Sequence, residues 1–97
     1  MRAWMVERRL ATVATRLKSL RADLAVIDEQ LLHLDADADE QELRAMVAET
    51  AHASHEARDA RRHVDSMRRH RAHVVEEIAE LERRQDDLLD QLTAAPH

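Results

Sequence analysis

The chain has 97 residues, with no glycine, no cysteine, one proline and a formal net charge of −5. Because glycine and proline make most tight turns, their near absence excludes a β-sandwich, a barrel or a doubly wound sheet and predicts one small all-α domain. The lack of cysteine excludes disulfides and thiolate metal sites. Charged residues make up 36% of the chain and aromatic residues 1%, a composition typical of long helices and coiled coils.

The first predicted helix covers about residues 3–34 and carries an uninterrupted heptad pattern. Its apolar residues follow one another in alternating steps of three and four, as the a and d positions of a coiled coil do. These residues are Val6, Leu10, Val13, Leu17, Leu20, Leu24, Ile27, Leu31 and Leu34. The pattern predicts one side of a helix–helix seam.

An acidic stretch follows, in which no apolar residue is larger than alanine. Its carboxylates are Asp35, Asp37, Asp39, Glu40 and Glu42, which we name the acidic tip. Asp37 with Glu40, or Asp39 with Glu42, resembles a capping box at the start of a new helix. We therefore predict a turn at about residues 35–39. The alternative is a helix that continues through the acidic stretch.

The second predicted helix covers about residues 40–94 and has a weaker heptad pattern. Folded back on the first helix, it gives an antiparallel two-helix coiled-coil hairpin in which leucines face alanines. The predicted hairpin seam consists of Leu10, Val13, Leu17, Leu20, Leu24, Ile27, Leu31, Leu34, Leu43, Met46, Ala53, Ala57, Ala60, Val64 and Met67.

The two predicted arms have unequal lengths, because at about 1.5 Å per residue the second helix spans roughly 80 Å and the first roughly 45 Å. Beyond about residue 74 the second helix would lack cover. Burying a leucine-sized side chain contributes roughly 1.5–3 kcal/mol, so we expect two chains to associate there into a helical bundle. The expected dimer interface consists of Val74, Val75, Ile78, Leu81, Gln85, Leu88, Leu89 and Leu92.

Charge is segregated along the chain: residues 1–21 carry +5, 22–56 carry −9, 57–73 carry +4 and 74–97 carry −5. With a turn at residues 35–39, the two basic blocks would meet at the open end of the hairpin. The candidate basic patch consists of Arg58, Arg61, Arg62, Arg68, Arg69 and Arg71. Nucleic-acid binding is not expected, because stacking aromatics and a groove-entering motif are both missing.

The sequence contains no motif of an enzyme or of a cofactor site. It lacks a glycine-rich phosphate loop and a cysteine nucleophile, and two extended helices offer a poor pocket. Glu49 and His52 have the Glu-x-x-His spacing of di-iron bundles, but only one such motif occurs. We expect no catalytic residue, no metal, no cofactor and no small-molecule substrate.

These features predict a non-enzymatic coiled-coil module for protein–protein interaction. We expect a homodimeric scaffold, adaptor or regulatory subunit whose partners are itself and another protein. No stretch reaches the roughly 20 apolar residues of a membrane span, so we expect no membrane partner and a cytoplasmic location. The excess of arginine over lysine suggests a bacterial source. The alternative function is an acidic-tipped finger that acts on a larger machine such as RNA polymerase.

Overall fold

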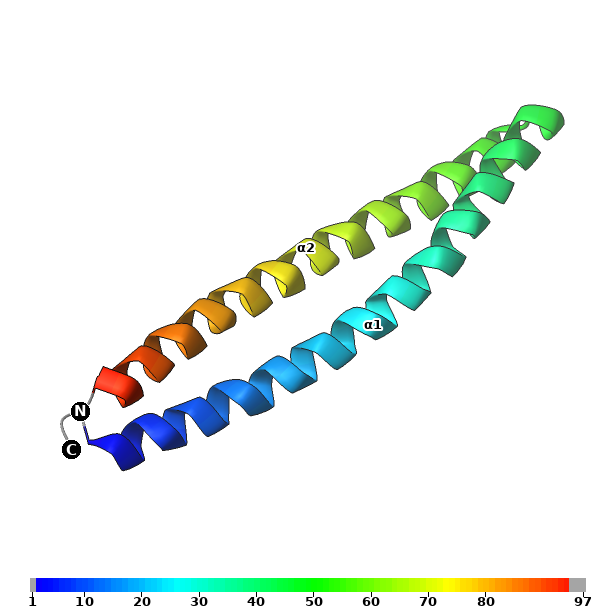
Figure 1. The fold of residues 1–97 in the computed structure, drawn as a ribbon. Helices are drawn as coiled ribbons and strands as arrows, with labels where there is room; N and C mark the ends of the chain where they lie inside the picture. Colours follow the sequence, from blue (N-terminus) through cyan, green and yellow to red (C-terminus); the bar gives the residue numbers. More distant parts are fainter. Residues whose placement is uncertain (1, 95–97) are drawn as a thin grey trace. The chain divides into compact units, whose positions relative to one another are not determined.

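A computed structural model describes residues 2–94 of the chain. It contains two helices, α1 (Ala3–Ala48) and α2 (Ala51–Ala94), which pack against each other (Figure 1). The predicted all-α helical hairpin is therefore confirmed. The predicted unequal arms are wrong, because α1 has 46 residues and α2 has 44.

The hairpin turns at Glu49 and Thr50, and the predicted turn at residues 35–39 is wrong. Glu49 has a left-handed backbone, with φ of 51°, and its N–H donates to the carbonyl of Ala45 at 3.1 Å. This combination is a common end of a helix. Thr50 then caps α2, because its hydroxyl oxygen accepts the N–H of Ala53 at 3.1 Å.

The helix continues through residues 35–39 because alanine is sufficient to fill the seam there. Ala38 is the a position that follows Leu31, and it has 0% exposed surface. Gln41 and Ala45 continue the same register as half-buried residues. Small seam residues such as Ala38 and Ala45 let two helices approach closely. The absence of a large apolar side chain therefore does not end the seam.

Leu43 and Met46 lie outside the seam, contrary to the prediction. They belong to α1 and are 59% and 69% exposed. The prediction placed them at the start of a new heptad pattern, whereas α1 keeps its first register to its end. In that register Leu43 is an f position and Met46 a b position, both on the side away from the seam.

The chain divides into two compact units, and each unit contains a part of both helices. Residues 25–73 form the turn unit, which includes Glu49 and Thr50. Residues 1–24 and 74–97 form the end unit, of which 2–24 and 74–94 are described. The expectation of one domain stays a prediction.

In the end unit α1 covers the face of α2 that was expected to be an overhang. Val74, Ile78 and Leu88 are only 6%, 9% and 5% exposed within a single chain. Leu81, Gln85 and Leu92 are half-buried. Only Val75 and Leu89 of the expected dimer interface are exposed, at 40% and 45%. The prediction of an uncovered apolar overhang was wrong because it followed from the predicted turn at residues 35–39.

The bounds of the helices and the buried positions together give the register of the seam. In the end unit they place Leu20 opposite Ile78, and in the turn unit they place Leu34 opposite Val64. Nearer the turn they place Ala38 opposite Ala60. This register differs from that of a hairpin turning at residues 35–39, so the predicted alignment of the two helices is wrong.

Leu17→Ala should lower the free energy of unfolding by about 2–5 kcal/mol, because Leu17 is only 1% exposed and its truncation leaves a cavity in the seam. The matched control is Leu32→Ala, since Leu32 is 74% exposed, and its effect should stay within about 0.5 kcal/mol. Urea unfolding followed by circular dichroism measures both. Equal decreases in the free energy of unfolding for the two variants would contradict the burial of Leu17 in the seam.

Glu49→Gly should raise the free energy of unfolding by up to about 1 kcal/mol, because glycine adopts positive φ without the steric cost of a Cβ atom. Glu49→Ala removes the same carboxylate but keeps the Cβ atom, so it should give no such gain. The same urea titration compares them. A hairpin destabilised by Glu49→Gly would contradict the left-handed turn.

Candidate functional site

Ion pairs between the helices have opposite polarity in the two units. In the end unit α1 supplies the cations: Arg16 pairs with Glu77 at 3.0 Å and Arg21 with Glu82 at 3.6 Å. In the turn unit α1 supplies the anions and α2 the arginines, as in the pair of Asp28 with Arg71 at 2.5 Å. Each acidic block therefore lies beside a basic block of the same chain. The predicted meeting of the two basic blocks was wrong, because it also depended on a turn at residues 35–39.

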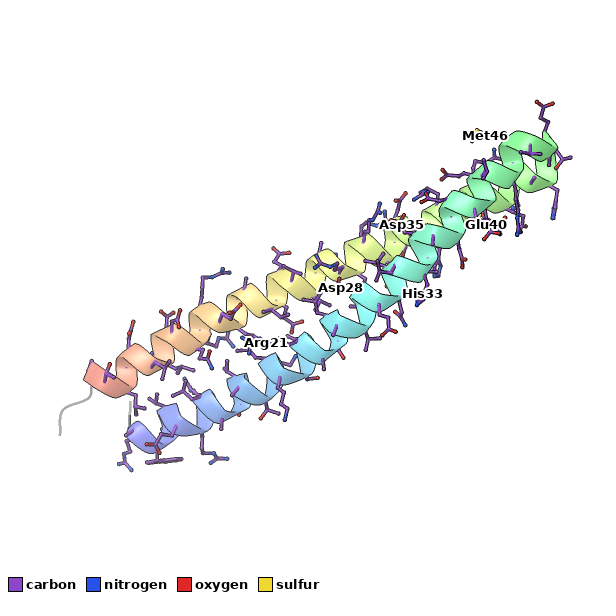
Figure 2. The ribbon with its side chains drawn as sticks, turned by 45° about the vertical axis from the view of Figure 1, so that its right-hand side comes forward. Arg21, Asp28, His33, Asp35, Glu40 and Met46 are labelled. Carbon is purple, nitrogen blue, oxygen red and sulfur yellow. The ribbon has the colours of Figure 1, made fainter. Side chains whose placement is uncertain are left out.

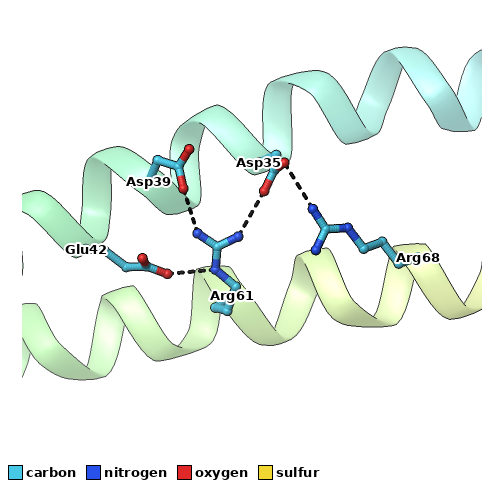
Figure 3. A network of polar contacts seen from close by, with 5 residues as sticks. All are labelled: Asp35, Asp39, Glu42, Arg61 and Arg68. Carbon is cyan, nitrogen blue, oxygen red and sulfur yellow. Dashed lines mark hydrogen bonds and ion pairs between the residues drawn. The ribbon is translucent and has the colours of Figure 1, made fainter.

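Arg61 is the centre of the largest group of these contacts (Figure 3). Its three guanidinium nitrogens donate separately: Nη1 to Asp35 at 2.9 Å, Nη2 to Asp39 at 2.8 Å and Nε to Glu42 at 2.6 Å. The second oxygen of Asp35 accepts a bond of 3.0 Å from Arg68. One arginine of α2 thus holds three carboxylates that span two turns of α1.

The hydrogen bonds to Glu42 and Asp39, in that order of effect, raise the pKa of Arg61 above its already high ordinary value. The hydrogen bond to Asp28 likewise raises the pKa of Arg71. A raised pKa in a base means that the charged form stabilises the fold until the pH exceeds that pKa. Both arginines therefore stay charged throughout the neutral range, and their contacts do not switch with pH there.

Most carboxylates of the acidic tip are already occupied by arginines of the same chain. Asp35, Asp39 and Glu42 bind Arg61, and Glu40 pairs with Arg44 at 2.5 Å. For Asp37 the described residues provide no ion-pair partner. These carboxylates lie along α1, whereas the end of the hairpin is formed by Glu49 and Thr50.

The basic patch is occupied in the same way. Arg61, Arg68 and Arg71 bind carboxylates of α1, and Arg62 pairs with Asp59 on its own helix. Within residues 2–94, Arg58 and Arg69 form no ion pair. The six arginines therefore do not form a free cationic surface.

Large apolar side chains are instead exposed on the outer face of α1 in the turn unit. We name Leu32, Leu43, Met46 and Val47 the outer stripe; they are 74%, 59%, 69% and 79% exposed. All occupy b, c or f positions, on the side of α1 away from α2, and Met46 is labelled in Figure 2. Single exposed apolar residues are common on protein surfaces, so it is the grouping of Leu43, Met46 and Val47 within little more than one helical turn that makes this face the candidate site.

The sequence analysis missed this face because it ended the first heptad pattern at Leu34. Continuing that pattern through Ala38 and Ala45 assigns Leu43, Met46 and Val47 to outer positions. The signal was therefore present in the sequence, but it required alanine to count as a seam residue.

Other kinds of site find no support in the described part of the chain. Among residues 2–94, no group of three or more histidine, aspartate or glutamate side chains could hold a metal ion. The helices α1 and α2 are also too polar for either to span a lipid bilayer over the residues described.

Comparison with protein-family models, with curated proteins and with solved structures found no match to this chain. A function for the chain must therefore be inferred from its own surface chemistry.

Arg61→Gln should lower the melting temperature, because Asp39 and Glu42 would then lose their cation and Asp35 would keep only Arg68. Arg58→Gln is the matched control: it removes the same charge from the same helix, and Arg58 has no ion pair within residues 2–94. Thermal unfolding by circular dichroism at low and high salt measures both. The difference between the variants should shrink at high salt, because salt screens exposed charges. Equal melting temperatures for the two variants at low salt would contradict the ion pairs of Arg61 with Asp35, Asp39 and Glu42.

Proposed function

We propose that this chain is a non-enzymatic helical-hairpin module that binds a protein partner through the outer stripe. The observation that carries the proposal is the exposure of Leu32, Leu43, Met46 and Val47 on one face, next to a seam that the chain closes by itself. Burying each of these side chains would contribute roughly 1.5–3 kcal/mol. This burial opposes the loss of freedom on association most effectively when the face is held in place before binding.

The contacts of the turn unit support such preorganisation. Arg61 links three carboxylates of α1 to α2, and Ala38 and Ala57 are buried beside them. A segment fixed in this way loses little conformational freedom on binding, which leaves more of the contact energy for affinity. The seam and the ion pairs therefore hold the outer stripe on a regular helix.

Self-association remains part of the proposal, but it needs a different surface from the one first expected. Val74, Ile78 and Leu88 are buried in the seam and cannot bind a second chain while the hairpin is closed. A homodimer would have to use residues that are exposed in the single chain. A scaffold, an adaptor and a regulatory subunit all fit such a module, as does a cytoplasmic location.

The alternative function, an acidic-tipped finger that acts on a larger machine, has less support. Its activity would require free carboxylates at the end of the hairpin, and Asp35, Asp39, Glu40 and Glu42 are bound by arginines. The residues nearest the turn include Met46 and Val47, which are apolar.

A photo-crosslinking experiment tests the proposed function. A photoreactive phenylalanine analogue replaces Leu43 in the full chain, and illumination in its native cells should give a covalent adduct with a protein. The matched control carries the analogue at Ala72, which is exposed on the outer face of α2. An adduct from position 72 but none from position 43 would contradict the proposal.

A further inference from the structure

We propose that the end unit binds a phosphate group between Arg9 of α1 and Arg84 of α2. The ligand is inorganic phosphate or a small phosphomonoester, which present the same doubly charged group. The site is separate from the proposed function, because the outer stripe lies in the turn unit and the phosphate site lies wholly in the end unit.

Arg9 and Arg84 face each other across the seam of the end unit. The ion pair of Arg16 with Glu77 gives the alignment of the two helices there. Arg9 lies one heptad before Arg16, and Arg84 lies one heptad after Glu77. Because the helices of a hairpin are antiparallel, both steps lead to the same layer of the seam. Arg16 therefore meets an anion, whereas Arg9 meets a second cation.

The same two arginines line one surface hollow of about 520 Å³, whose walls come from both helices. The other lining residues are Thr12, Val13, Asp87, Leu88 and Gln91. Val13 and Leu88 are 6% and 5% exposed and belong to the seam, so they form an apolar floor. Sites for small molecules usually have volumes of roughly 300–1,000 Å³. The hollow is therefore large enough for a phosphate group that carries a small organic body.

This chain does not neutralise the two arginines. Within residues 2–94 neither Arg9 nor Arg84 forms an ion pair, and both residues are exposed. Two like charges on facing helices repel each other, and an anion held between them replaces that repulsion by two attractions. The ligand that suits this hollow is therefore an anion that reaches both guanidinium groups at once.

A phosphate group meets that requirement better than a carboxylate. It carries roughly −1.5 to −2 charges at neutral pH, which balances two guanidinium groups. Its oxygens are arranged tetrahedrally, so arginines on opposite sides can each donate to a different pair of oxygens. A carboxylate is planar and carries a single charge, which one arginine already satisfies.

The remaining polar groups of the hollow modify the affinity. The side-chain amide of Gln91 is a further donor for a phosphate oxygen. The hydroxyl of Thr12 donates to the carbonyl of Arg8 at 3.1 Å, so it does not donate to the ligand. The carboxylate of Asp87 repels an anion and keeps binding weak. The two arginines therefore carry most of the attraction.

Nuclear magnetic resonance titrations of the full chain test the site. Inorganic phosphate and phenyl phosphate are the two probes, added at constant ionic strength with chloride as the reference. Each probe that binds should shift the side-chain N–H signals of Arg9 and Arg84 to saturation. If neither probe gives a saturable shift of these signals, the inference is overturned.

Arg84→Glu should weaken phosphate binding about tenfold or more, because it removes one guanidinium group and places a carboxylate opposite Arg9. Arg83→Glu is the matched control, since it makes the same charge change at the adjacent residue, which does not line the hollow. Glu80 and Asp87 lie three or four residues from both positions, so the neighbouring charges on α2 are also matched. Equal weakening by the two variants would show a response to net charge alone and would overturn the inference.

Melting temperatures provide a second measurement on the same variants. Without phosphate and at low salt, Arg84→Glu should melt at a higher temperature than Arg83→Glu, because a glutamate at position 84 can pair with Arg9 as Glu77 pairs with Arg16. Phosphate should then stabilise Arg83→Glu more than Arg84→Glu, since only the former keeps both arginines of the site. An Arg84→Glu chain that melts no higher than Arg83→Glu without phosphate would contradict the facing of the two arginines and overturn the inference.

The two probes also distinguish the sources of the phosphate group. Tighter binding of phenyl phosphate supports a phosphomonoester whose organic part lies in the hollow, and equal or tighter binding of inorganic phosphate supports the free ion. Failure of both probes leaves the proposed function intact, because crosslinking at position 43 reports on the turn unit.

Discussion

The two helices pack against each other through alanine in the turn unit, and the rest of the structure depends on that contact. Ala38 has no exposed surface although its side chain is a single methyl group, so α2 must lie directly against α1 at this point. Because the seam passes through Ala38, α1 continues through the acidic stretch and the turn falls at Glu49 and Thr50. The position of the turn then decides which charged segments lie side by side.

A seam of leucine, valine and alanine tolerates several alignments, and the charges of this chain select one of them. Arginines of α1 meet glutamates of α2 in the end unit, whereas arginines of α2 meet carboxylates of α1 in the turn unit. A hairpin that turned at residues 35–39 would instead bring the two basic blocks, residues 1–21 and 57–73, together. Single exposed ion pairs contribute little to stability, so their main effect here is to specify the alignment.

The fold class and the seam of α1 up to Leu34 could be read from the sequence, because large apolar residues at strict heptad spacing have few other interpretations. The position of the turn could not be read from the sequence, because no glycine or proline marks it and Glu49 has a left-handed backbone that glutamate seldom adopts. The outer stripe was hidden for the same reason, since Leu43 and Met46 matched a second heptad pattern. Their outer position follows from the burial of Ala38, which continues the first heptad register through Ala45.

The position of the turn also suggests an order of folding. Glu42 and Arg61 are separated by 19 residues, whereas Arg16 and Glu77 are separated by 61. Closing a long loop costs more chain entropy than closing a short one, so contacts beside Glu49 and Thr50 should form earliest and those at the termini last. The hairpin would then zip from its closed end, with the guanidinium of Arg61 among the first groups to join the two helices.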